Sequence, residues 1–163
     1  MSTLCQRCGL CCDGNLFTHV PLQPSEVAAA RWNALDVVAL VDGSPALRQC
    51  CTALKGRWCT RYLERPEGCR RYRCRLLTAL AGQEISFEEA LAVVEQAHAL
   101  LASLERGLAP ETDTPPSPVL QRSRFAELSE DGGLSSETRA LRERTEAFLD
   151  RHFHGGPRRF AGS

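Results

Sequence analysis

The chain has 163 residues, 43% hydrophobic and 6% aromatic, enough for one domain with a modest core of mainly aliphatic side chains. Its 20 basic and 20 acidic residues cancel at pH 7, which argues against a general binder of polyanions. Nine cysteines are many for a chain of this length.

The elements expected near the N-terminus are short. Alternating apolar residues predict a strand over residues 16–22. Ser25, as N-cap, is expected to open a helix that ends near Trp32. The pair Ser44-Pro45 repeats this start signal and predicts a second helix over residues 44–51, which would carry two adjacent cysteines.

A hairpin is expected next. Lys55-Gly56 is a turn signal between short strands at 51–54 and 57–62. A tight hairpin of this kind would bring Cys51 and Cys59 to one point.

A helical turn is expected after the hairpin. Arg65-Pro66 ends the second strand, and the turn that follows would carry Cys69 and Cys74. No cysteine occurs after Cys74, so we interpret residues 1–80 as a metal-binding domain.

Residues 81–155 are expected to form a helical extension. Ser86 and Glu89 form a capping-box pair that opens a strongly amphipathic helix, and Gly107 is its expected stop. His98 falls on the apolar face and is expected in the core. The apolar face is also a candidate surface for a protein partner, because a small protein has little core to cover it.

The end of the chain is predicted to hold one more helix. Residues 109–118 contain four prolines and are expected to be a linker. The helix follows over residues 136–153, and residues 156–163 are expected to be a flexible tail. These elements predict an α+β fold that is mainly helical, with a small irregular metal-stabilised part and a helical C-terminal extension.

No export signal is visible. Residues 1–25 lack an apolar run behind a basic start, and no stretch approaches the roughly 20 apolar residues that span a bilayer. We therefore expect a cytoplasmic protein, in which thiols stay reduced. Clustered cysteines then indicate metal or redox chemistry rather than disulfides.

The first cysteine cluster is a double C-x2-C run. Cys5, Cys8 and Cys11 can turn three thiolates toward one ion, as in iron–sulfur sites, and zinc could use two or three of them. Cys12 directly follows Cys11, so their side chains leave the backbone in different directions. One of them serves a second metal or lies buried as a small apolar group.

The second cluster is spread more widely and must supply the missing ligands. It consists of Cys50, Cys51, Cys59, Cys69 and Cys74. Nine basic and two acidic residues fall in 48–75, a net charge of +7. We expect these arginines to lower the pKa of nearby thiols and to offset the charge of a thiolate–metal centre.

The two clusters together resemble the CxxCxxCC family of zinc- or iron-chelating cysteine-cluster proteins. The matching residues are Cys5, Cys8, Gly9, Cys11 and Cys12, then Cys51, Cys59, Tyr62, Arg65-Pro66, Cys69, Tyr72 and Cys74. The resemblance implies that these eight cysteines bind zinc or iron, as a mononuclear or binuclear centre or an iron–sulfur cluster. Cys50 lies outside the pattern and is left as a spare or substitute ligand.

Two other functions stay open. Some relatives resemble flagellin lysine methylases, which suggests an iron–sulfur enzyme component, but the chain lacks a G-x-G-x-x-G turn and an acid–base–nucleophile set. We therefore expect no catalytic residue. The arginines could also form a nucleic-acid-binding zinc module, which we consider weaker because aromatic residues are few and the chain has one lysine.

The histidines are weaker candidates for metal ligands than the cysteines. His19 lies near the first cluster in sequence and is a minor candidate ligand, though solvated or capping roles are commoner. His152 and His154 lie at a helix end, where a cation favours the helix dipole, so weak metal binding is the less favoured interpretation.

Overall fold

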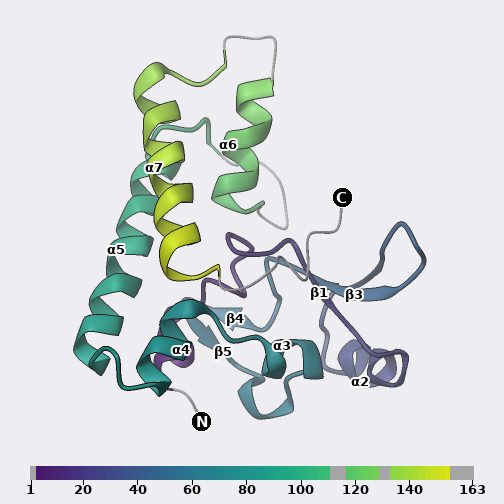
Figure 1. Cartoon of the computed structure of the whole chain (residues 1–163). Helices are drawn as coiled ribbons and strands as arrows, with labels where there is room; N and C mark the ends of the chain where they lie inside the picture. Colours follow the sequence, from purple (N-terminus) through teal and green to yellow (C-terminus); the bar gives the residue numbers. More distant parts are fainter. Residues whose placement is uncertain (1–2, 111–116, 129–132, 155–163) are drawn as a thin grey trace. The chain divides into compact units, whose positions relative to one another are not determined.

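The computed structural model describes residues 3–110, 117–128 and 133–154 (Figure 1). It divides into two compact units, which hold the described residues of 3–73 and of 74–154. Helices outweigh strands, so the expected α+β, mainly helical class is confirmed. The predicted tail at 156–163 and most of the predicted linker lie outside the described residues.

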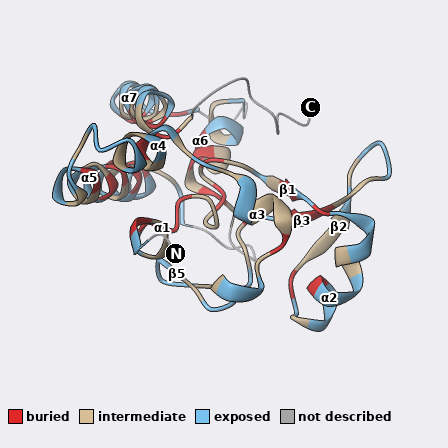
Figure 2. Ribbon diagram, turned by 60° about the horizontal axis from the view of Figure 1, so that its bottom comes forward, coloured by how far each residue is buried: buried red, intermediate tan, exposed pale blue. Residues whose placement is uncertain are grey.

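A three-stranded antiparallel sheet organises the first unit. β1 (His19–Pro21) and β2 (Val37–Ala39) both pair with β3 (Pro45–Arg48), which is the central strand. The register sets Val20 and Val37 against Leu47 from its two sides. β3 is largely buried, whereas the turn that joins β2 to β3 is exposed (Figure 2).

The predicted helix over residues 44–51 is wrong. The segment is β3 followed by an irregular stretch, and β2 was not predicted at all. Pro45 stands at the first residue of a strand, a position that tolerates a missing N–H as well as the first turn of a helix does. The Asp42 carboxylate accepts the Ser44 N–H at 2.9 Å, which forms a turn instead of a helix start.

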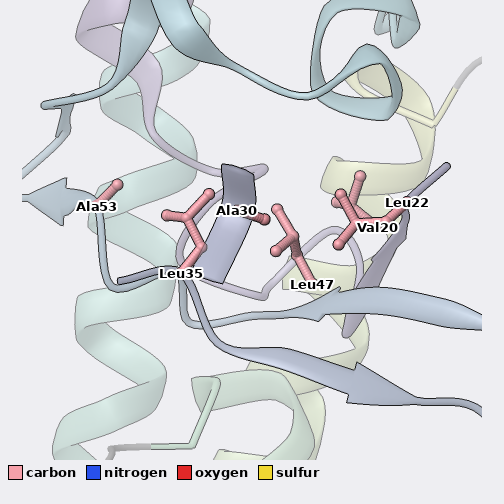
Figure 3. Close-up of a cluster of buried hydrophobic side chains, with 6 residues drawn as sticks. All are labelled: Val20, Leu22, Ala30, Leu35, Leu47 and Ala53. Atoms are coloured by element: carbon pink, nitrogen blue, oxygen red, sulfur yellow. The ribbon is translucent and has the colours of Figure 1, made fainter. Parts of the chain in front are cut away.

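A cluster of six buried side chains forms the core of this unit (Figure 3). Its members are Val20, Leu22, Ala30, Leu35, Leu47 and Ala53. They come from the sheet, from α2 (Val27–Trp32) and from the loops, so no single element could bury them alone. We call this cluster the first core.

The start of the helix after β1 differs from the prediction. A 3-10 turn, η1 (Pro24–Glu26), leads into α2. Gln23 is the N-cap of η1 and Glu26 is that of α2, so Ser25 caps neither. The Gln23 N–H donates to the Glu26 carboxylate at 3.1 Å. The predicted strand over 16–22 is confirmed only for β1.

The hairpin predicted after Lys55 is present. β4 (Leu54–Lys55) pairs with β5 (Trp58–Cys59), and Gly56 takes the positive φ of 60° that the turn requires. A 3-10 turn, η2 (Tyr62–Glu64), follows. Pro66 then ends the extended segment and caps α3 (Glu67–Arg71).

Four helices make up the described part of the second unit. They are α4 (Arg75–Ala81), α5 (Phe87–Arg106), α6 (Val119–Leu128) and α7 (Ser136–His152). α5 and α7 lie side by side (Figure 1). Both were predicted from sequence, and the Ser86–Glu89 capping box closes at 3.1 and 2.7 Å.

Gly107 ends α5, as expected, but for a reason of packing. Its φ is −85°, which any residue can adopt. A Cβ at this position would lie 2.8 Å from Oγ1 of Thr138 on α7. Glycine therefore lets the two helices approach each other closely at this end.

Helix α6 was not predicted, because its own sequence is weakly amphipathic. Leu120 and Ser123 are its buried residues, while Phe125 and Leu128 are exposed. Charge pairs fix it against α7: Glu127 accepts from Arg139 at 2.9 Å, and Arg124 donates to a carboxylate of α7 at 2.9 Å. These partners are remote in sequence, so no local pattern reveals them.

Two expectations about histidines need correction. His98 is half-exposed on α5, so it is not a core residue. Partial burial lowers the pKa of His152, and the charges of Arg151 and Arg75 lower it further. The neutral ring is therefore favoured at His152, contrary to the expected cation at the helix end.

None of the helices that the structure describes is both long and apolar enough to cross a lipid bilayer.

The central position of Leu47 can be tested by truncation. Leu47 is 1% exposed, so Leu47→Ala should lower the free energy of unfolding by about 2–5 kcal/mol. Val41→Ala, at a fully exposed position in the turn before β3, is the matched control. If the two variants lower the free energy of unfolding equally in denaturant titrations, the assignment of β3 as a buried strand is wrong.

Candidate metal centre

The N-terminal cysteines lie on a short helix and the turn after it. α1 (Thr3–Cys8) carries Cys5 and Cys8 three residues apart, on one side of the helix. Gly9, at φ +71°, ends the helix, and its carbonyl accepts the N–H of Cys12 at 2.8 Å. A Cβ on Gly9 would lie 3.1 Å from the Arg57 backbone, so the close approach also requires glycine.

Cys12 is tied to the second cluster through the backbone. The Cys51 N–H donates to the Cys12 carbonyl at 2.7 Å, across 39 positions of sequence. The Cys51 carbonyl in turn accepts the Leu54 N–H at 2.9 Å, which leads the chain into β4. This backbone hydrogen bond makes Cys12 and Cys51 neighbours in the fold.

Cys59 ends the second strand of the hairpin. It pairs with Leu54 across the ladder, and the next residue, Thr60, donates its N–H to Ala53 at 2.8 Å. Cys51 and Cys59 are both half-buried, and both pack against the first core. The hairpin thus brings them to the same core, as its turn signal suggested.

Cys69 is delivered by α3, which is held by two contacts. A Cβ on Gly68 would lie 2.6 Å from the Pro21 carbonyl oxygen, so only glycine lets α3 sit this close to β1. The Glu26 carboxylate accepts the Glu67 N–H at 2.7 Å, at the N-terminal end of α3. Cys69 also packs against the first core.

Cys50 and Cys74 both make hydrogen bonds through their sulfur atoms. The Cys50 thiol donates to the Asp13 carbonyl at 2.9 Å. Cys74 is the first residue of the second unit, where its sulfur accepts the Leu77 N–H at 3.3 Å and caps α4. Cys74 is thus outside α3, although one helical turn was expected to carry it together with Cys69.

Burial dominates the electrostatics of the thiols. It raises the pKa of Cys12 strongly, and the negative charges of Cys51, Cys59, Cys69 and Asp13 raise it further. Burial and then Cys51 raise the pKa of Cys69 to about 12, and burial also raises that of Cys51. The neutral thiol is the favoured form of these groups.

The expected effect of the arginines is outweighed. Arg65 does lower the pKa of Cys69, but burial and the thiolate of Cys51 act more strongly in the opposite direction. The Arg65 guanidinium itself stacks 3.6 Å above the Tyr62 ring. Loss of hydration therefore shifts the pKa of Cys69 more than the nearby positive charge does, because the thiol packs against an apolar core.

The thiols do not lie at the distances from one another that ligands of one metal ion have. In the described segments, no group of three or more His, Cys, Asp and Glu side chains is placed closely enough to hold an ion. The Nδ1 of His19 lies 3.1 Å from the Thr18 hydroxyl, a local contact on the sheet. His154 pairs with Asp150 at 2.5 Å on α7.

Sulfur is the prevailing donor at this site. Zinc and iron–sulfur clusters are the centres that proteins hold by several thiolates. A small domain with nine cysteines, of which those of the hairpin and α3 pack against one core, has the donor set of a cysteine-rich metal-chelating domain.

The chain belongs to the CxxCxxCC family. The model of that family, described as a "putative zinc- or iron-chelating domain", matches residues 4–93. The resemblance seen in the sequence is thereby confirmed. Neither a curated protein nor a solved structure matches the chain.

Sequence reasoning missed the residues that place the cysteines. Glu26 bonds to Glu67 across 41 positions of sequence, so no local pattern indicates this role. Gly68, in Pro-Glu-Gly-Cys, carried a usable signal, since a glycine directly before a candidate ligand suggests close backbone approach. The sequence does not indicate that β1 is the element that α3 approaches.

Removal of the Glu26 carboxylate should loosen α3. Glu26→Ala leaves the N–H groups of Gln23 and Glu67 without their acceptor, and should cost about 1–3 kcal/mol in unfolding free energy. Zinc affinity, measured by competition with a chelator, should fall with it. Glu26→Gln keeps one acceptor oxygen and should recover part of both losses.

Glu64→Ala is the control for this prediction, because Glu64 is exposed and pairs locally with Arg61. If Glu26→Ala binds zinc as tightly as Glu64→Ala does, Glu26 does not position the metal site.

Proposed function

We propose that this protein binds zinc or iron in the cytoplasm, either as ions or as an iron–sulfur cluster, through clustered cysteine thiolates. The proposed ligands are Cys5, Cys8, Cys11, Cys12, Cys51, Cys59, Cys69 and Cys74. Metal chelation in general follows from the family. The choice of these ligands, of the metal and of the compartment is the proposal.

One observation supports the ligand assignment most strongly. Cys51, Cys59 and Cys69, from three separate segments, pack against the same core, and Cys12 is hydrogen-bonded to Cys51. Cysteines also pack against cores as small apolar side chains. The convergence of thiols from separate segments, joined to a fourth through the backbone, is also what a common cation would require.

The protonation of these cysteines fits a metal site better than a set of free thiols. Buried thiolates repel one another, so without a cation the thiols keep their protons. A bound Zn²⁺ or an iron–sulfur cluster would compensate several thiolate charges at once. Binding would require deprotonation and a contraction of the sulfur atoms around the metal.

Metal binding would stabilise the first unit substantially. Structural zinc contributes apparent free energies of roughly 10–16 kcal/mol in small domains, against a typical total stability of roughly 5–15 kcal/mol. The first core has only six buried side chains, two of them alanines. The metal-free protein is therefore expected to be loosely folded in this unit.

The arginines around the hairpin have structural partners. Arg61 pairs with Glu64 at 3.3 Å, and Arg71 pairs with Glu67 at 3.1 Å. Arg65 stacks on Tyr62. Nucleic-acid binding thus gains no support from these three residues.

Elemental analysis of the purified full chain should find zinc or iron bound. A colourless protein indicates zinc, and a brown one that absorbs visible light indicates an iron–sulfur cluster. Cys69→Ser should lower the metal content and destabilise the first unit. A wild-type protein that is free of metal, fully folded and unaffected by chelators would refute the proposal.

Cys50→Ser is the matched control. Cys50 is a half-buried neighbour of Cys51, but its thiol donates to a backbone carbonyl and it lies outside the family pattern. Its loss should change the metal content far less than Cys69→Ser does.

Zinc affinity should rise with pH. Because the pKa values of Cys12, Cys51 and Cys69 are raised, these thiols are protonated in the metal-free protein at neutral pH, and zinc must displace the protons. Each displaced proton adds about one decade of affinity per pH unit. Competition titrations between pH 6 and 8 measure this slope, and a flat profile would contradict it.

A further inference from the structure

We propose that Cys50 is a positioning residue of the metal site and not one of its ligands: its thiol holds the turn at Cys12 and Asp13 against the segment that carries Cys51. The inference rests on the proposed function, since it concerns how two of the proposed ligands are placed. It gives a role to the cysteine that lies outside the family pattern and that the sequence left as a spare or substitute ligand.

Two hydrogen bonds join the turn at residues 12–13 to residues 50–51. The Cys51 N–H donates to the Cys12 carbonyl at 2.7 Å, and the Cys50 thiol donates to the Asp13 carbonyl at 2.9 Å. The first bond lies between backbone atoms, so any residue except proline could make it at position 51. The second bond requires the side chain of Cys50, and a substitution there can remove it.

These bonds extend the pairing of β1 with β3. In that ladder His19 faces Arg48, and directly beyond it the Gln49 N–H donates to the Thr18 carbonyl at 2.9 Å. Cys50 is the next residue on one side, whereas residues 14–17 intervene on the other side before Asp13 is reached. The thiol thus supplies a donor at the point where the two segments meet again in a new register.

Residues 14–17 have anchors of their own. Leu16 is 8% exposed, and the Phe17 ring meets the Tyr72 ring edge-on, with 4.5 Å between their centroids. Loss of the Cys50 thiol should therefore leave the metal-bound unit folded and let the turn at residues 12–13 shift. Because ligands must be held in a defined orientation, a shift of this kind weakens metal binding.

The adjacent side chains of Cys50 and Cys51 have different surroundings. Cys51 packs against the first core, whereas the sulfur of Cys50 contacts the Asp13 carbonyl oxygen. A carbonyl oxygen is an acceptor, so the thiol makes this contact with its hydrogen, while a metal ligand is a thiolate without one. The contact therefore fits a residue that holds the turn rather than one that binds the ion.

Serine and alanine variants of Cys50 separate the hydrogen bond from the sulfur atom. Both remove the sulfur, but only serine keeps a donor. In the full chain, Cys50→Ala should weaken zinc binding about two- to tenfold, the range expected for one hydrogen bond of ordinary strength. Cys50→Ser should stay closer to wild type. Competition with a chelator measures both affinities, and circular dichroism shows whether the variants are folded.

Co²⁺ distinguishes a positioning residue from a ligand, because its absorption reports the number of thiolates bound to it. At saturating Co²⁺, Cys50→Ala should give the wild-type spectrum per bound ion, since no ligand has been removed. Cys69→Ser is the matched control. It removes a proposed ligand and should lower the thiolate absorption.

The results also separate this inference from the proposed function. If Cys50→Ala and Cys50→Ser bind zinc equally tightly, the hydrogen bond does not position the site. If either variant loses thiolate absorption at saturating Co²⁺, Cys50 is a ligand. Both results overturn the positioning role and leave metal chelation in place. If wild type binds neither zinc nor Co²⁺, the proposed function itself fails, and the positioning role fails with it.

Discussion

The burial of several thiols against one small apolar core is the constraint on which the first unit depends. Each of these thiols loses hydration, and each thiolate would repel the others, so the group holds its protons unless a cation is present. The same burial that suppresses the charge also strengthens any interaction with a cation. A site of this kind is therefore poor as a set of free nucleophiles and well suited to a metal.

The contacts that hold the cysteines in place act across long stretches of chain. The bond from Cys51 to Cys12 closes one loop, and the bond from Glu67 to Glu26 closes another. Gly68 lets α3 lie against β1 where a side chain would collide with the Pro21 carbonyl. These contacts set the approximate positions of the thiols, and a bound metal would stabilise the fold that holds them.

The second unit depends on different physics. α5 buries an apolar face against α7, with Leu104, Leu149 and Phe153 almost fully buried. Paired charges then attach α6 to α7, and its exposed Phe125 and Leu128 show how little apolar surface it buries. Its described helices thus form a compact unit through apolar packing and ion pairs, with no cysteine beyond Cys74.

The sequence by itself determined the cysteine family, the long helices α5 and α7, and the hairpin at Gly56, because spacing, capping and turn residues are local signals. Only the tertiary structure decided that residues 45–48 form a central strand, because Pro45 suits a strand start as well as a helix start until β1 and β2 flank it. It likewise decided which thiols share the first core and that Glu26 supports α3. The paired residues are about 40 positions apart in the chain, too far for the periodicity of a helix or strand to predict the contact.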